Sequence, residues 1–491
     1  MNPITLPVAE LKPAIAGLGK IIGKRCTLPV LGCVRIERTR EGRIELTGTD
    51  LDRTATVRLH TPDQGEPTAI LVPLEDLANL AKSSGRNDTL VLTKAEDHKA
   101  VFRFAVAGQM LEHRCESLPV SEFPELESVP GNQVVLNAAL RGSIHDALAC
   151  ASTDATRLVL NGAYLDVSKP DAHYVVGTDG SHLFSSNSFT LALPESLILP
   201  THPFLGWRGF NEDGDWKLRL KPATKDNAPI FELATEHWRY VSRSHDGNYP
   251  NWRQVVPAGR DFTGCIEIAP ESIDAVIQTI TRLPDHDERY HAIGIETQNG
   301  RLQLLAKSER EQPWMPIEVP GAKASGKDVR TFVNRITLLK ALRFGLTRID
   351  FIDALSPLRV AAGGRQMIIM PVRVEGEAPA TNNPPPAPAP AAVNTNPPPP
   401  RAEQPKKEEN KMPENNNGGA KPTEPNKEEP KPALDLAIAQ IELVRGDFRN
   451  AVAGLNKLGD LLKQVQREQK TSERDISSVR ATLRSLQSVR I

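Results

Sequence analysis

The sequence lacks the features that mark secreted, membrane-spanning or zinc-binding proteins. It has no Cys-x-x-Cys pair and no run of about 18 uninterrupted apolar residues. Its first residues, MNPITLPVAELKPA, show no charged segment followed by an apolar one, so neither secretion nor a membrane span is expected. The scattered cysteines favour buried thiols in a reducing cytoplasm; they are Cys26, Cys33, Cys115, Cys150 and Cys265. We therefore expect a cytoplasmic protein.

An excess of charge of either sign is also missing. The 60 Lys and Arg residues nearly balance 61 Asp and Glu residues, which leaves a formal charge of -1. This balance argues against a polycation that coats nucleic acid. It leaves open a protein that confines its basic residues to one surface. By segment, the charge is -2 for residues 1–374, -2 for 375–432 and +3 for 433–491.

Large apolar side chains are almost absent from residues 375–432. This segment contains 16 of the 41 prolines but no Leu, Ile, Phe, Tyr or Trp. It cannot bury enough apolar surface to offset the entropy lost on ordering. The composition predicts a disordered, proline-rich linker.

Signatures of catalysis are missing as well. Gly19-Lys20 resembles part of a phosphate-binding loop, but Ala14 occupies the first glycine position and no Ser or Thr follows the lysine. His286-Asp287 and His291 could suggest a metal site, yet further ligands are not evident, and a charged turn is the simpler interpretation. No Gly-x-Ser-x-Gly elbow occurs. We predict no enzyme activity, no cofactor and no metal.

What the first 374 residues do contain is a repeat. Gly32, Gly162 and Ala292 are spaced by 130 residues, each after a helical stretch, and the strand ends at Gly48, Gly177 and Ala306 are spaced by 129. The first helical stretches of the three copies are residues 8–22, 139–151 and 271–283. The second stretches are residues 73–82, 200–210 and 333–344, each followed by alternating strands.

This period predicts an α+β fold of three repeated domains, each with two helices and antiparallel sheets. The expected domains are residues 1–126, 127–257 and 258–374, followed by the linker 375–432 and a helical segment 433–491.

Residues 433–491 show heptad spacing. With Leu434 at position a, fourteen of sixteen a and d positions are apolar, which predicts a coiled coil. The polar residues Gln469 and Ser472 could instead mark the turn of an antiparallel helical hairpin. Both alternatives stay open.

The repeat carries short motifs that together resemble a known family. They are Thr27-Leu28-Pro29-Val30-Leu31-Gly32, Thr49-Asp50-Leu51, Leu160-Asn161-Gly162, Thr178-Asp179-Gly180, Tyr249-Pro250 with Val255-Val256-Pro257, and Met370-Pro371-Val372-Arg373. In this order and spacing they resemble the bacterial DNA polymerase III beta subunit, or beta sliding clamp, family over residues 1–374. The resemblance implies a DNA polymerase processivity factor: a head-to-tail homodimer that closes into a ring around duplex DNA without catalysing a reaction.

A sliding ring must hold phosphates without reading bases, and basic helices suit that task. Residues 8–25 and residues 333–345 each carry a net charge of +3, and the family places these helices at the bore of the ring. The expected DNA-contacting residues are Lys12, Lys20, Lys24, Arg25, Lys82, Arg141, Arg208, Arg335, Lys340 and Arg343.

The resemblance also implies a hydrophobic pocket between the second and third domains that binds short peptides of the polymerase catalytic subunit and the clamp loader. The matching positions are Leu160, Thr178, Gly180, Ser181, His182, Leu183, Pro250, Gln254, Val255, Ile368, Ile369, Met370, Pro371, Val372 and Arg373. Ser181-His182 replaces the His-Arg pair usual in the family, and Gln254 stands where a basic residue is common. Both departures remove charge from the pocket rim.

Ring closure and the tail raise further expectations. Lys99 and Arg103 could meet Glu309 and Glu311 of a second copy. The segment 433–491 could self-associate, bind another replication or repair protein, or bind the chain's own pocket through Gln440-Ile441-Glu442-Leu443-Val444, which resembles the clamp-binding peptide. The competing hypothesis for the whole chain is a clamp-derived scaffold that no longer encircles DNA and acts through its coiled coil.

Overall fold

The computed structural model describes residues 3–374 except Lys24, Arg25, Thr27, Asp97, Ala107, Asp226 and Glu288. The predicted linker 375–432 and helical segment 433–491 lie outside the described residues.

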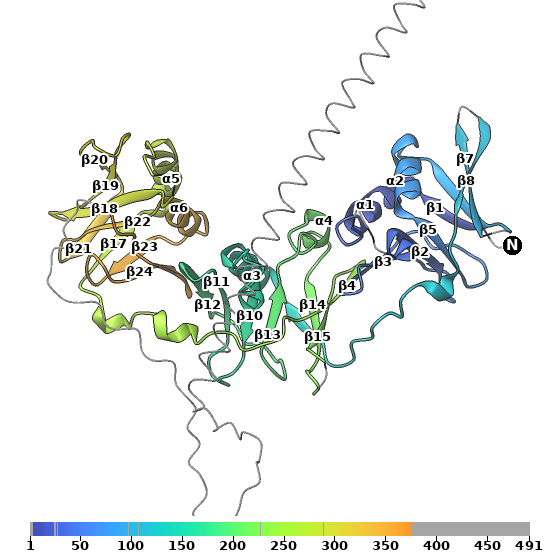
Figure 1. The fold of residues 1–491 in the computed structure, drawn as a ribbon, viewed down its shortest axis with the longest axis horizontal. Helices are drawn as coiled ribbons and strands as arrows, with labels where there is room; N and C mark the ends of the chain where they lie inside the picture. The colour runs from blue at the N-terminus through green and yellow to red at the C-terminus, as the bar shows by residue number, and fades with distance from the viewer. Residues whose placement is uncertain are drawn as a thin grey trace, which may run out of the picture. The chain divides into compact units, whose positions relative to one another are not determined.

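Helices recur at the predicted spacing. The first helix of each copy is α1 (Val8–Leu18), α3 (Ala138–Cys150) or α5 (Ile273–Arg282), and the second is α2 (Leu74–Ser83), α4 (Arg208–Asn211) or α6 (Arg335–Arg343). Five of them match their expected ranges within a few residues at either end. In Figure 1, α1 lies beside α2 and α5 beside α6, which agrees with their packing contacts.

The prediction of a helix over residues 200–210 was largely wrong. β13 (Leu197–Pro200) ends at its first residue, turns follow, and only Arg208–Asn211 is helical. Pro203 and Gly206 interrupt the segment, and both residue types disfavour a helix interior. Phe204 and Leu205 are nevertheless fully buried. The apolar residues of this segment therefore indicated burial and not a helix.

A four-stranded antiparallel sheet lies in each of the first and third copies. The first has the order β1 (Ile4–Pro7), β6 (Thr89–Lys94), β7 (Lys99–Val106), β8 (Gln109–Glu116). The sheet in the third copy has the order β20 (Met315–Glu318), β19 (Arg301–Ala306), β18 (Ala292–Gln298), β22 (Arg330–Asn334). In both sheets the last-named and first-named strands are edges.

Two longer sheets join strands of neighbouring copies. The eight-stranded sheet has the order β5 (Thr68–Pro73), β2 (Cys33–Arg38), β3 (Ile44–Thr49), β4 (Arg53–Arg58), β16 (Trp238–Arg243), β15 (Ile230–Ala234), β14 (Trp216–Lys221), β9 (Val134–Leu136). The nine-stranded sheet has the order β13, β10 (Gly162–Asp166), β11 (Tyr174–Thr178), β12 (His182–Ser186), β25 (Arg365–Ile369), β24 (Leu358–Ala362), β23 (Arg348–Phe351), β17 (Gly264–Ile268), β21 (Ala322–Gly326). The copies are thus joined by backbone hydrogen bonds at β4–β16 and at β12–β25.

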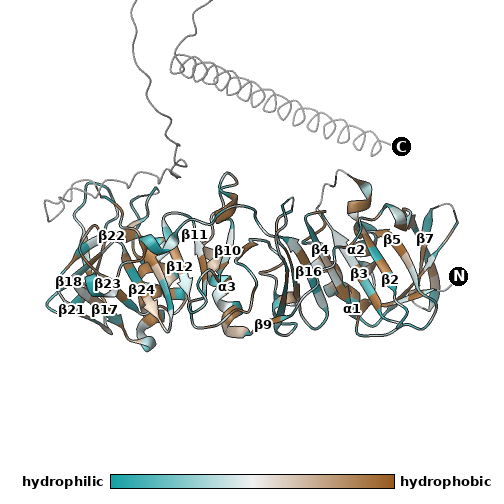
Figure 2. Cartoon of the chain, turned by 90° about the horizontal axis from the view of Figure 1, so that it is seen from below, coloured by the Kyte–Doolittle hydropathy of each residue, from teal (hydrophilic) through white to brown (hydrophobic). Residues whose placement is uncertain are grey.

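The core lies between the helices and the sheets. Val8, Leu11 and Leu18 of α1 recur at helical spacing and are fully buried. Gly177 lets α3 approach β11 closely, because a Cβ there would overlap the backbone of Ala147. Figure 2 shows hydrophobic and hydrophilic residues interleaved along the strands, as expected for sheets with one covered face.

Among the described residues, none of the helices is long and apolar enough to span a membrane.

Candidate peptide pocket and DNA-contacting helices

The β12–β25 pair forms the floor of the candidate pocket. His182 pairs with Ile369 and Leu183 with Ile368 in antiparallel register. Leu183 and Ile368 are buried and pack with Val176 and Trp252 in one small apolar cluster. Residues some 185 positions apart in the chain are therefore neighbours in one sheet.

A tight turn next to this floor carries the polar rim. Gly180 has a φ of +92°, which glycine adopts at little cost. Asp179 Oδ1 accepts hydrogen bonds from the backbone N–H groups of Ser181 and His182 and from the Ser181 hydroxyl. Burial alone would raise the pKa of Asp179, but the hydrogen bonds from His182 and Ser181 outweigh it and lower that pKa.

His182 ties this turn to the third copy. Its side chain is 5% exposed, and Nδ1 lies 3.0 Å from Asp179 Oδ1. Lys340 of α6 places Nζ 3.2 Å from Nε2 of His182 and donates to the Ala149 carbonyl oxygen at 2.9 Å. An ammonium group can only donate, so Nε2 accepts and Nδ1 carries the proton that faces Asp179. We call Asp179, His182 and Lys340 the rim network.

The other predicted pocket residues differ in exposure. Leu160, Thr178 and Ile369 are buried, whereas Val255 and Met370 leave 48% and 45% of their surface exposed. Met370 donates its N–H to the Ser181 carbonyl oxygen, and Val372 donates to that of Phe332. The exposed or half-exposed remainder is Gly180, Ser181, Pro250, Gln254, Pro371, Val372 and Arg373.

The predicted DNA-contacting cations differ in exposure. Lys12, Lys82, Arg208 and Arg343 are exposed, and Lys20 and Arg141 are half-buried. Among the exposed ones, Arg208 is paired with Glu212 at 2.7 Å, and Lys12 donates to the Ser84 carbonyl oxygen at 3.0 Å. Arg141 donates to the Gly214 carbonyl oxygen. Lys24 and Arg25 lie outside the described residues.

Arg335 does not fit its predicted role. It is 8% exposed, donates to the Pro284 carbonyl oxygen at 2.8 Å and lies 3.8 Å from Asp285. Burial lowers the pKa of Arg335 while Asp285 opposes that shift. The side chain thus holds the loop after α5 against α6, and we remove it from the DNA-contacting set. Sequence reasoning missed this because charge counting along a helix does not separate its faces.

The residues expected at ring closure are accessible. Lys99, Arg103, Glu309 and Glu311 are all exposed. Arg103 pairs within the chain with Glu112 of the edge strand β8 at 2.8 Å. Exposed apolar residues accompany it on this hairpin: Val106, Met110 and Leu111.

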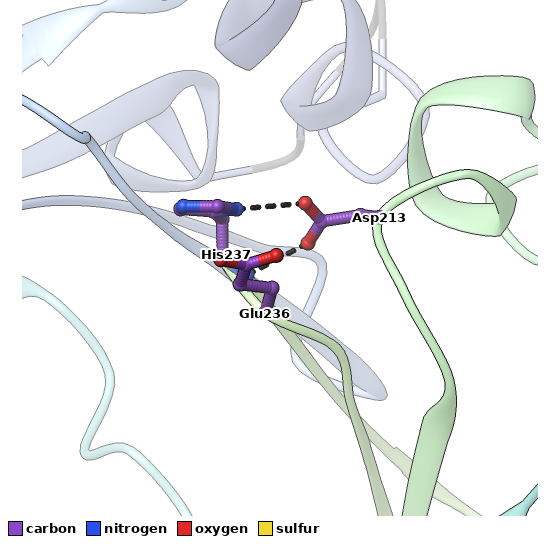
Figure 3. A group of neighbouring side chains, drawn as sticks. All are labelled: Asp213, Glu236 and His237. Atoms are coloured by element: carbon purple, nitrogen blue, oxygen red, sulfur yellow. Dashed lines mark hydrogen bonds and ion pairs between the residues drawn. The ribbon is translucent and has the colours of Figure 1, made fainter.

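A carboxylate and imidazole cluster, which the sequence did not point to, lies beside the β15–β16 hairpin. Asp213, Glu236 and His237 bring one ligand atom each within 4.8 Å of one another; Figure 3 shows them facing one another. Asp213 already accepts from the Thr235 hydroxyl, the His237 N–H and His237 Nδ1, all at 2.6 to 2.7 Å. These bonds suit a cap on the hairpin turn, and we assign it no metal.

The two motifs set aside in the sequence have ordinary local roles. Gly19 is the C-cap of α1. Nδ1 of His291 lies 2.6 Å from Asp285, and Asp287 accepts from the N–H of Arg289. Each belongs to a turn.

The pairing of neighbouring copies into continuous sheets, with helices packed on them, defines a sliding-clamp fold. Two comparisons support it. The structure is similar to the DnaN sliding clamp (DNA polymerase III subunit beta) of Pseudomonas aeruginosa solved with griselimycin, with a TM-score of 0.65 and 24% identity over 76% of this chain and 99% of that one. It is also similar to the sliding clamp of Bacillus subtilis, with a TM-score of 0.64 and 18% identity over 76% and 99% of the two chains.

Sequence relatives agree with the fold. The beta sliding clamp of Pseudomonas aeruginosa is 27% identical over 319 residues, which cover 63% of this chain and 82% of that protein. That of Escherichia coli K12 is 21% identical over 366 residues, or 72% and 94%. No family model matches the chain. The resemblance drawn from the motifs is confirmed: the chain is a relative of the bacterial beta sliding clamps.

We expect Arg335→Gln to destabilise the fold by about 1–3 kcal/mol, because the Pro284 carbonyl oxygen loses the donor of the buried Arg335 and Asp285 loses a counter-charge. Chemical denaturation measures the effect. Arg343→Gln on the same helix is the control and should shift stability by less than about 0.5 kcal/mol, since its side chain is exposed. Equal effects of the two substitutions would contradict the assignment.

Stability should also depend on Asp146, which lies on α3 with Oδ2 3.4 Å from Arg365 of β25. Burial raises the pKa of Asp146 to about 6, and Arg365 offsets only part of this. From about pH 4 to pH 6 the folded protein retains a proton that the unfolded chain has lost, so this residue's contribution to stability falls as pH rises.

We therefore expect Asp146→Asn to stabilise the protein at pH 8 by about 1–3 kcal/mol, with the gain disappearing near pH 4. Thermal unfolding across this range measures it. A gain that does not change with pH would count against the protonation of Asp146.

Proposed function

We propose that the protein is a DNA polymerase processivity factor, a sliding clamp that holds the polymerase on duplex DNA. The observation that carries the proposal is the clamp fold over 76% of the chain, together with its beta sliding clamp relatives. No catalytic step is part of it. The scaffold alternative is not favoured, because every relative named above is a clamp.

In its finer form the proposal has three domains, residues 1–126, 127–257 and 258–374. Two copies join head to tail in the cytoplasm as a homodimeric ring. The unpaired edges of β8 and β20 support this arrangement, since an edge strand presents free backbone groups to a second chain. Exposed charged pairs contribute little on their own, so the exposed apolar residues of the β7–β8 hairpin carry more weight.

Exposed cations on the helices are proposed to contact DNA. Lys82 and Arg343 are exposed and lie at the ends of α2 and α6. Basic side chains on phosphates bind every sequence alike and exchange easily, which allows sliding. Lys340 contributes less in this scheme, because its Nζ is held by His182 and Ala149.

The surface above β12 and β25 is proposed to bind short peptides of the polymerase catalytic subunit and clamp loader. A buried floor with exposed Val255 and Met370 above it offers apolar contact, and Met adapts to varied anchors. Ser181 and Gln254 leave the rim with less charge than the family pattern. The self-association, partner-binding and own-pocket hypotheses for residues 433–491 stay proposals.

Ring topology predicts a specific loss from DNA. The protein loaded on nicked circular DNA should remain bound, and it should leave when the circle is cut, because a ring slides off free ends. Gel filtration of the DNA-bound fraction before and after cutting measures this. Retention after linearisation would favour the scaffold alternative.

The DNA-contacting assignment predicts a change in salt dependence. Lys82→Gln and Arg343→Gln should weaken non-specific duplex binding and reduce the slope of log K against log salt by about 0.9 for each lost phosphate contact. Lys217→Gln, which removes an exposed lysine from β14 instead of a helix, is the matched control and should leave the slope unchanged. An equal change in the control would refute the assignment.

The pocket assignment predicts a loss of peptide affinity. Met370→Ala should weaken binding of a Gln-Leu-x-Leu-Phe peptide about tenfold, because it removes an exposed apolar contact beside the β12–β25 floor. Fluorescence anisotropy of the labelled peptide measures this. Met315→Ala, on β20, is the control, because Met315 is the same residue type and is 46% exposed. If Met315→Ala lost as much peptide affinity as Met370→Ala or more, the peptide would bind elsewhere.

A further inference from the structure

A basic cavity lies where the described chain ends. It encloses about 660 Å³ and is lined by His286, Asp287, Arg289, Tyr290, Lys307, Arg310, Arg373 and Val374. Arg289, Lys307 and Arg373 bring three permanent cations to this cavity, and Asp287 is the acid among its described lining residues. The exposed acids Glu309 and Glu311 flank Arg310 in sequence but do not line the cavity.

Two lining side chains have buried polar atoms that suit a bound ligand, those of Lys307 and His286. Lys307 is 6% exposed; its Nζ donates to the Arg310 carbonyl oxygen at 2.7 Å and lies 4.9 Å from the Trp314 ring centre. A buried ammonium group with no carboxylate in these contacts favours an anionic ligand. His286 stands edge-on against the same Trp314 ring, and its buried Nδ1 has no hydrogen-bond partner in the described part of the chain.

The electrostatics of His286 point the same way. Burial lowers its pKa first, and the charges of Lys307 and Arg310 lower it further, whereas Asp285 and Asp287 raise it without restoring the ordinary value. Burial is the largest cause of this shift, which describes a poorly solvated ring beside the Lys307 ammonium group.

The sequence supplies an anion at this place. Val374 lines the cavity, and the chain continues as Glu375-Gly376-Glu377. At up to about 3.5 Å per residue, the Cα atoms of Glu375 and Glu377 stay within roughly 10 Å of the Cα atom of Val374. Such a tether gives them an effective concentration that a free anion does not reach.

We propose that this cavity binds the acidic start of the chain's own C-terminal extension, with the carboxylates of Glu375 and Glu377 facing Arg289, Lys307 and Arg373. The contact fixes the point at which the extension leaves the clamp body. It also brings the extension to Arg373, which belongs to the proposed peptide pocket.

The test titrates His286 by NMR in the full-length protein with labelled histidine, assigned with His286→Gln. A nearby carboxylate stabilises the protonated ring, so the pKa of His286 should fall by about one unit in the double variant Glu375→Gln, Glu377→Gln. The double variant Glu408→Gln, Glu409→Gln makes the same charge change more than thirty residues further along the extension and should leave it unchanged. No difference between wild type and the first variant would overturn the proposal.

Inorganic phosphate separates the tethered ligand from a free one. It should raise the pKa of His286 in the Glu375→Gln, Glu377→Gln variant and much less in wild type, where the extension already occupies the cavity. An equal response in both proteins would assign the cavity to an external anion and overturn the proposal. The titration involves neither DNA nor a partner peptide, so its failure is distinct from failure of the clamp function.

Discussion

The antiparallel pairing of β12 with β25 is the contact on which the candidate site depends. It joins strands 185 positions apart into one nine-stranded sheet and places Leu183 beside Ile368, at the floor of the proposed pocket. Backbone hydrogen bonds set this register, and a slip of one residue would turn Leu183 and Ile368 to the opposite face. The positions of the proposed pocket residues, of His182 in the rim network and of Arg365 beside Asp146 all depend on this strand pair.

The rim network links surfaces with different proposed partners. Asp179 and Ser181 border the proposed peptide pocket, whereas Lys340 belongs to α6, one of the helices proposed to face DNA. His182 accepts a hydrogen bond from Lys340 at Nε2 and donates one from Nδ1 to Asp179, so both neighbours determine its tautomer. The ammonium group of Lys340 therefore links the second and third copies, and these contacts compete with any contact to a phosphate.

Sequence patterns predicted most of the fold for a definite reason. Val8, Leu11 and Leu18 recur at helical spacing because one face of α1 is buried, and this periodicity is local. The helix prediction for residues 200–210 failed because Phe204 and Leu205 are buried in an irregular segment. Buried apolar residues in such a segment look like those of a buried helix in the sequence. The pocket positions were predicted only through the motifs, since no local rule brings residue 183 to residue 368.

The sequence by itself indicated the spacing of the repeat, most of the helices and strands, the clamp resemblance and the position after Val374 where Leu, Ile and aromatic residues give way to proline. Tertiary structure alone decided which charges are available. Arg335 and Arg343 look alike along the chain, yet one is buried on Pro284 and the other is exposed. Charge is a property of a residue, but access to a partner depends on which atoms the fold has already satisfied.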